Sequence, residues 1–151
     1  MKNNKIKIYP VKDKHINFYL ASRNKLINRK ISSSLKKITK LEHYNWWFND
    51  KKRKSFVVEK NKKKLMILTE DIYFSKKNKF IYTGLISCSE KIDLIDLLKA
   101  VQWQNERVSL NKNSINIITV HKHNLFGNKQ QKFFKFNALD KKSVLYKEAT
   151  K

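Results

Sequence analysis

The residues best suited to chemistry gather in the first third of the chain. Arg23 and Asn24 are adjacent hydrogen-bond donors that could contact a substrate, although a helical arginine also pairs readily with a carboxylate. The side chain of an unperturbed histidine has a near-neutral pKa, so His43 could orient a substrate or accept a proton through water. Trp46 and Trp47 could form a wall on which a sugar ring stacks. The same rings could instead pack together in the core, so both interpretations stay open.

Further candidates lie later in the sequence. Glu70 and Asp71 fall on an expected strand, where a carboxylate could act as a general base or remain solvated. His121 and His123 have the spacing of two side chains on one face of a strand, but no third ligand lies nearby, so no metal site is predicted. Cys88 is the only cysteine, which excludes an internal disulfide and a multi-cysteine zinc site.

Length and composition indicate one folded domain over residues 1–151. The chain is 40% hydrophobic and 12% aromatic, enough to build a core. It has no apolar run of membrane-spanning length and no recognisable signal peptide, so we expect a cytoplasmic protein without a membrane partner.

The formal net charge of +23 suggests a nucleic-acid partner at first sight. Only four of the 35 basic residues are arginines, however, and the rest are lysines. Lys, Asn and Ile are all abundant, and AT-rich codons encode all three. Dedicated nucleic-acid sites favour arginine for bidentate and stacking contacts. Compositional bias is therefore our preferred explanation, and nucleic acid remains an alternative partner.

Hydrophobic periodicity indicates alternating strands and helices. Strands are expected at 5–9, 55–59, 65–74, 80–88, 115–120 and 143–146, and helices at 15–30, 39–48, 91–108 and 125–136. Two capping-box patterns, Thr39 with Glu42 and Ser87 with Glu90, mark expected helix starts. This order predicts a mixed α/β layer structure.

This order, together with several motif residues, resembles the GCN5-related N-acetyltransferase (GNAT) superfamily, and most closely its amino-sugar N-acetyltransferases of surface and flagellar glycan synthesis. The residues that carry the resemblance are Arg23-Asn24, Ser32 to Ser34, Ile38, His43 and Trp47-Phe48. The resemblance implies a mostly antiparallel central sheet with about four helices. It also implies direct acyl transfer from acetyl-CoA to a small amine, such as a nucleotide-linked amino sugar.

The resemblance also implies roles for individual residues. Catalytic candidates are Glu70 and His43. Substrate-binding candidates are Arg23, Asn24, His43, Trp46 and Trp47. Cofactor-binding candidates are Ser87, Cys88, Ser89, Lys91 and Asn124.

Two departures from the family pattern bear on activity. The family's glycine-rich diphosphate loop should fall near residues 87–93, which contain no glycine and carry Glu90 and Asp93. Gln131 stands where the family has a tyrosine that protonates the departing thiolate. A catalytically inactive GNAT-fold protein and a basic nucleic-acid-binding module are therefore the alternatives. An active transferase requires a groove between the fourth and fifth strands that is open at the start of the helix over 91–108, whereas loss of catalysis predicts that side chains of 88–93 fill the cofactor site.

Overall fold

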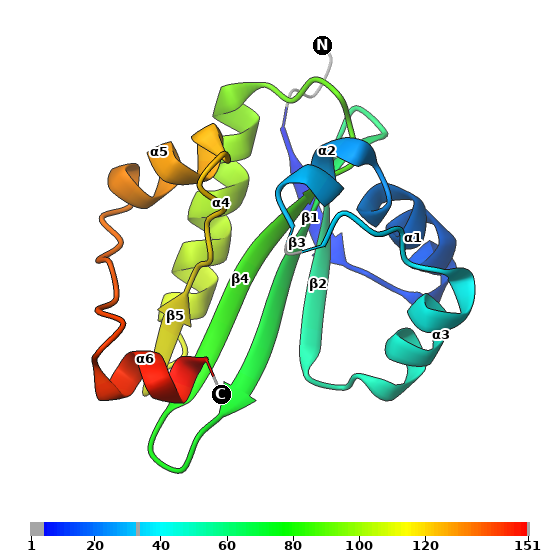
Figure 1. The fold of residues 1–151 in the computed structure, drawn as a ribbon. Helices are drawn as coiled ribbons and strands as arrows, with labels where there is room; N and C mark the ends of the chain where they lie inside the picture. The colour runs from blue at the N-terminus through cyan, green and yellow to red at the C-terminus, as the bar shows by residue number, and fades with distance from the viewer. Residues whose placement is uncertain (1–4, 33, 151) are drawn as a thin grey trace.

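A five-stranded sheet forms the centre of the computed structural model, which describes residues 5–32 and 34–150 (Figure 1). The strands lie in sequence order, and neighbours are antiparallel except for β4 and β5, which are parallel. The elements are β1 (Lys7–Pro10), η1 (Asp13–His15), α1 (Ile16–Arg23), α2 (Leu26–Lys30), α3 (Lys40–Asn49), β2 (Arg53–Lys60), β3 (Lys63–Phe74), β4 (Lys79–Ser87), α4 (Leu94–Ser109), β5 (Ser114–Ile117), α5 (Leu125–Phe133) and α6 (Val144–Ala149).

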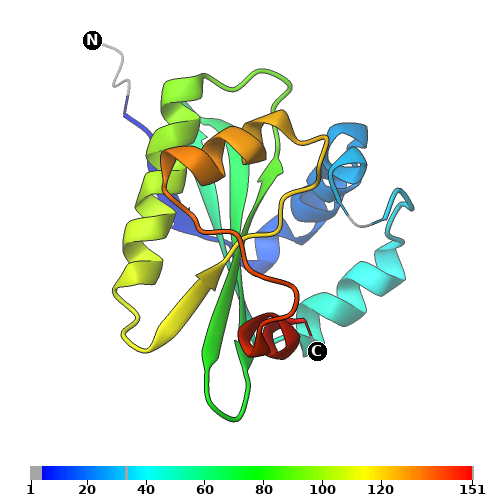
Figure 2. The same ribbon diagram turned by 60° about the vertical axis from the view of Figure 1, so that its left-hand side comes forward.

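Helices cover both faces of the sheet because side chains of a strand alternate between faces. On β3, Met66 and Leu68 pack toward Ala100 of α4. Ile67, between them in sequence, packs with Tyr19 of α1 on the other face. Figures 1 and 2 show α1, α2 and α3 grouped on one side of the molecule and α4 on the other. No helix in the described residues is both long and apolar enough to cross a bilayer.

A two-residue turn joins β2 and β3. Asn61 and Lys62 connect the paired residues Lys60 and Lys63, and both have positive φ, at 50° and 64°. Two consecutive positive φ values characterise the tight turn that matches the twist of paired strands. Asn61 suits this position because asparagine tolerates the left-handed region.

The expected helix over 15–30 is broken into η1, α1 and α2. Lys25, between α1 and α2, is extended, with φ −61° and ψ 141°. The break turns Asn28 back toward α1, where its side chain donates a hydrogen bond to the Ser22 carbonyl at 2.7 Å. A buried amide with fixed partners thus overrides the helical periodicity of the segment.

Two other expectations are corrected at element ends. The helix expected at 91–108 begins at Leu94, and its cap is Asp93 rather than Ser87, which belongs to β4. The segment 143–146 is the start of α6 rather than a strand, because the Ser143 hydroxyl accepts a hydrogen bond from the Tyr146 N–H and caps the helix. The capping box of Thr39 and Glu42 at α3 is confirmed.

Candidate active site

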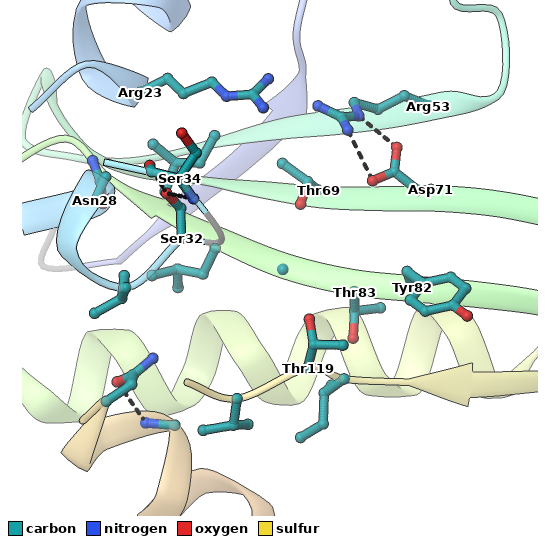
Figure 3. A pocket seen from close by; sticks show the side chains of 18 of the residues that line it. Arg23, Asn28, Ser32, Ser34, Arg53, Thr69, Asp71, Tyr82, Thr83 and Thr119 are labelled. Atoms are coloured by element: carbon teal, nitrogen blue, oxygen red, sulfur yellow. Dashed lines mark hydrogen bonds and ion pairs between the residues drawn. The ribbon is translucent and has the colours of Figure 1, made fainter. Parts of the chain in front are cut away.

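Strands β4 and β5 separate after a short pairing. Their pairing ends at Tyr82 and Ile117, whereas β4 continues to Ser87. Beyond Tyr82, β4 has no strand neighbour on that side among the described residues. A cleft of about 1370 Å³ opens there (Figure 3). Its walls include Tyr82, Thr83, Gly84, Leu85 and Ile86 of β4 and Ile118, Thr119 and Val120 after β5. A cleft between β4 and β5 meets the first part of what the transferase hypothesis requires, but no residue of 87–94, at the expected start of the next helix, lines it.

The free edge of β4 ends at Asn28. The side-chain amide of Asn28 accepts a hydrogen bond from the Ser87 N–H at 2.9 Å and donates to the Ser87 carbonyl at 2.8 Å. The next N–H, that of Cys88, instead donates to Leu65 at the start of β3. Consecutive peptide groups therefore point to opposite sides, as in a strand. Asn28 acts as a one-residue strand partner and fixes α2 beside the cleft.

Three of the four arginines of the chain, Arg23, Arg29 and Arg53, line the cleft. Arg53 forms a bidentate pair with Asp71, with N–O distances of 2.5 and 2.9 Å. Its guanidinium lies 4.4 Å from the ring centroid of Trp46. Burial lowers the pKa of Arg53, but the hydrogen bond to Asp71 and nearby charges outweigh it, so the net pKa is raised. Arg53 is thus a neutralised, fixed cation.

Arg23 differs from Arg53 because no carboxylate neutralises it. Within the described residues its guanidinium forms no hydrogen bond and no ion pair, and it lies 5.8 Å from the ring centroid of Trp46. Figure 3 shows the guanidinium groups of Arg23 and Arg53 turned toward each other. Burial, and then the charge of Arg53, lower the pKa of Arg23. Since arginine stays charged at neutral pH, Arg23 presents to the cleft a cation that has no ion-pair partner among the described residues.

His43 lies in an aromatic cluster on the same face. Tyr19 is fully buried, and its ring centroid lies 5.5–5.7 Å from those of His43, Trp46 and Trp47. Nε2 of His43 lies 2.9 Å from the Ile16 carbonyl, while the buried Nδ1 has no partner. Burial lowers the pKa of His43 despite that hydrogen bond. The imidazole is therefore neutral at pH 7 and donates from Nε2.

The tryptophans take different places. His43 and Trp46 line a smaller pocket that shares Arg23, Arg53 and other residues with the main cleft. Trp47 lines neither pocket, and its indole N–H donates to Asp13 at 2.9 Å. The structure thus brings Arg23, His43 and Trp46 together in the smaller pocket and places Trp47 in the supporting cluster. Asn24 lines only the main cleft, and its side-chain amide is bonded to the backbone of Ile38 at 2.8 Å in both directions.

The buried neutral state of His43 predicts a pH dependence of stability. Its folded-state pKa lies below that of the unfolded chain, so its contribution is complete above about pH 6.5 and is lost as the pH falls. We expect His43→Gln, which keeps a donor near Ile16, to flatten the decline in unfolding free energy between pH 7.5 and 5.5. One proton accounts for at most about 1.4 kcal/mol per pH unit. Urea titrations at several pH values measure the slope.

His15, whose pKa burial also lowers, supplies the comparison. His15→Gln should remove its own part of the slope, and the double variant should remove both. An unchanged slope in His43→Gln would contradict the assignment of a neutral, buried imidazole.

Glu70 faces away from the cleft. Thr69 and Asp71, its neighbours in β3, line the cleft, whereas Glu70 is buried on the α4 face. There it accepts a hydrogen bond from Arg107 of α4 at 3.1 Å. Burial raises the pKa of Glu70, and Arg107 opposes the rise. Because Glu70 lies on the opposite face of the sheet from the cleft, it is not placed to act as a base there, contrary to the expectation.

Only one of the five residues expected to bind the cofactor lies at the cleft. Asn124 lines the cleft, but Ser87, Cys88, Ser89 and Lys91 do not. Cys88 is buried, and burial raises the pKa of its thiol, so it is not a reactive thiolate. Among the described residues, no side chain of 88–93 lines the cleft, contrary to the expectation for an inactivated site.

Helix α5 closes one side of the cleft. Asn124 caps it by accepting a hydrogen bond from the Gly127 N–H at 3.0 Å. A Cβ on Gly127 would lie 2.8 Å from Val120, so only glycine allows α5 this close to the segment after β5. Gln130 lines the cleft, but Gln131, expected in place of the family tyrosine, does not.

Helix α6 closes the end near the β3–β4 hairpin. The Glu148 carboxylate accepts hydrogen bonds from Ser75 and Asn78, and the Tyr82 hydroxyl donates to the Ala149 carbonyl. Burial raises the pKa of Tyr82, so its phenol is protonated. Glu148 and Ala149 both line the cleft.

His121 and His123 lie near each other, with ring centroids 5.4 Å apart. The described residues contain no group of three or more His, Cys, Asp or Glu side chains that could hold a metal ion. His121 and His123 are therefore not assigned as metal ligands.

Sequence reasoning missed three contributors to the site: Asn28, Arg53 and Glu148. Each acts through a partner distant in sequence, such as Ser87 for Asn28 and Asp71 for Arg53. The one available signal was the scarcity of arginine, which makes each arginine of a lysine-rich chain worth attention.

The fold and the cleft define a class, the mixed α/β fold of GNAT acetyltransferases, and the expected fold class is confirmed. The sequence matches no family model and no curated protein. Its fold is similar to that of an N-acetyltransferase from Staphylococcus aureus Mu50, with TM-score 0.73 and 17% identity over 90% of this chain and 86% of that chain.

Two further solved structures are similar. A domain from Methanocaldococcus jannaschii DSM 2661 has TM-score 0.77 and 16% identity, with 93% of each chain covered. AAC(6')-Iy in complex with the bisubstrate analogue CoA-S-monomethyl-acetylneamine has TM-score 0.66 and 11% identity, covering 90% of this chain and 93% of that chain. At these identities the likeness establishes the fold, and the chain's own residues must supply the chemistry.

Proposed function

We propose that this chain is an N-acyltransferase that moves an acyl group from a thioester to the amine of a small anionic acceptor. The observation that carries the proposal is the cleft between β4 and β5, with the unpaired edge of β4 along one wall. An arm that contains amide groups can bind such an edge as an additional strand. Solved structures of similar fold include an N-acetyltransferase and an aminoglycoside acetyltransferase, which supports this reaction class.

The reaction has a simple balance of bonds. The amine nitrogen attacks the thioester carbonyl, the C–N bond forms and the C–S bond breaks. The proton that the amine loses ends on the departing sulfur. The phenol of Tyr82 and the hydroxyls of Thr69 and Thr83 are groups of the cleft that can relay or donate this proton.

The acceptor is anionic because Arg23 lacks a counter-charge. A carboxylate or phosphate on the acceptor would give Arg23 the bidentate partner that Asp71 gives Arg53. Glu42 and Glu148 also line the cleft and attract the amine end of such a molecule. A nucleotide-linked amino sugar combines an amine with phosphate and is the acceptor to test first.

The test is a thiol-release assay with the full chain and a panel of amines with and without an anionic group. We expect turnover with acetyl thioesters, and an N-acylated product by mass spectrometry. High salt and an unrelated polyanion serve as controls, because a chain of charge +23 attracts any phosphate. Thiol release without an N-acylated product, or no release with any amine, would exclude the proposed function.

Arg23→Gln should weaken binding of anionic acceptors specifically. A hydrogen bond to a charged group contributes about 1.5–3 kcal/mol, so we expect KM for the anionic acceptor to rise roughly 10- to 150-fold, with kcat little changed. Arg23→Lys should keep part of the affinity, since lysine retains the charge but not the fork geometry. Steady-state kinetics measure both constants.

Lys99→Gln is the matched control, because it removes the same charge from an exposed position on α4 that lies outside the cleft. If Arg23→Gln raises KM equally for acceptors with and without an anionic group, Arg23 does not bind the anionic group.

A further inference from the structure

The backbone N–H groups at the start of the loop between β4 and α4 already donate hydrogen bonds within the protein. A diphosphate held at a helix start needs free backbone N–H groups. Here the N–H of Ser87 donates to Asn28 at 2.9 Å. The N–H groups of Cys88 and Ser89 both donate to the Leu65 carbonyl, at 2.9 and 3.2 Å. Three consecutive donors that could face a phosphate are therefore already engaged.

The side chains of the loop are engaged as well. The Ser87 hydroxyl donates to the Ser89 carbonyl at 2.8 Å, and the Ser89 hydroxyl donates to the Lys91 carbonyl at 3.1 Å. The ammonium of Lys25 donates to the Cys88 carbonyl at 2.6 Å. These bonds engage residues 87–89, the part of the loop next to β4, and leave that part without the free donors of an anion cradle.

Negative charge occupies the start of α4. The Asp93 carboxylate caps the helix by accepting a hydrogen bond from the Ile95 N–H at 2.8 Å. Asp96 is buried in the first turn, and its carboxylate pairs with Lys60 at 2.8 Å. The carboxylate of Asp93 takes the place that the helix dipole offers to an anionic ligand. A diphosphate at this helix start would meet the carboxylate of Asp93, and the N–H groups of residues 87–89 would not be available to it.

The diphosphate of acetyl-CoA thus does not fit the residues present, although the cleft for a thioester arm does. We infer that the acyl donor of this chain is a thioester on a pantetheine-type arm that carries no diphosphate. The inference rests on the proposed function. The arm lies along the free edge of β4 between Tyr82 and Ser87, and donor selection falls to the β4–α4 loop.

The experiment compares initial rates with S-acetylpantetheine and with acetyl-CoA, using one acceptor and roughly 0.5 M salt to screen the surface charge. We expect kcat/KM for S-acetylpantetheine to lie within about tenfold of that for acetyl-CoA, because the diphosphate gains no hydrogen bonds from residues 87–89. A preference for acetyl-CoA of more than about tenfold would overturn the inference and leave the proposed function standing. Failure of both donors would overturn the proposed function, and the inference with it.

A third donor distinguishes the sources of such an arm. The same thioester can be linked through one phosphodiester to a serine of an acidic carrier protein, which the charge of +23 would attract. A higher kcat/KM with the carrier than with the free arm identifies a protein-bound donor. Equal values identify a small thioester, and both results support the inference.

Asp93→Ser tests the role of the loop directly. Serine preserves the helix cap and removes the carboxylate. We expect the ratio of acetyl-CoA to S-acetylpantetheine rates to increase severalfold in this variant. Asp140→Ser, at an exposed position outside the cleft, is the control for charge. No change of the ratio in Asp93→Ser would show that Asp93 does not select the donor.

Discussion

Tyr19→Ala should lower the free energy of unfolding by about 3–5 kcal/mol, the range for removal of a large buried aromatic side chain. Tyr19 is fully buried and packs with Ile67 of the sheet and with three rings of α3. Its loss would leave a cavity between α1, α3 and β3 that the surrounding rings cannot fill without moving. Urea denaturation at neutral pH measures the change.

Tyr19→Phe is the control for this prediction. It keeps the ring and removes only a hydroxyl that lies 3.4 Å from the Ser55 hydroxyl, so we expect a loss of less than about 1 kcal/mol. A loss of less than about 1 kcal/mol in Tyr19→Ala itself would refute the claim that this cluster anchors α1 and α3. Because α1 carries Arg23, Tyr19→Ala should also weaken binding of the anionic acceptor.

Asn28→Ala should cost about 2–4 kcal/mol of stability. The variant removes three hydrogen bonds to backbone groups, two to Ser87 and one to Ser22, and an unsatisfied buried group costs about 1–3 kcal/mol. Water entering from the cleft would recover part of this loss. We also expect faster hydrogen exchange at the Ser87 amide, because that N–H loses its acceptor.

Asn137→Ala is the matched control, since Asn137 is exposed and its side chain makes no hydrogen bond among the described residues. Urea denaturation and amide exchange of both variants separate a site effect from a general effect of losing an asparagine. An Asn28→Ala variant with wild-type stability and unchanged exchange at Ser87 would show that Asn28 does not hold the edge of β4.

The relation between Glu70 and Asp71 shows where the sequence stops being informative. Alternation along a strand requires that these neighbours face opposite sides of the sheet. It does not say which side holds the cleft. That depends on α4, whose Arg107 pairs with Glu70, and on Arg53 of β2, which pairs with Asp71.

Helix caps give a second comparison. The capping box of Thr39 and Glu42 is local, because both partners lie within one turn, and the sequence predicted it correctly. Ser87 and Glu90 have the same pattern, but Ser87 extends β4 and bonds to Asn28, so α4 starts after Asp93. A local signal failed where a distant partner competed for the same backbone group.

The sequence by itself predicted the mixed α/β fold class, the strands within 55–59 and 65–74, a helix within 91–108 and the capping box of Thr39 and Glu42. These features depend on periodicity, turn residues and neighbours within a few positions. The tertiary structure alone decided that β4 and β5 separate, that Arg53 has an ion-pair partner while Arg23 has none among the described residues, and that the N–H groups of residues 87–89 bond to α2 and β3. The physical reason is that each of these depends on hydrogen bonds or charges between residues far apart in the chain, which no local pattern encodes.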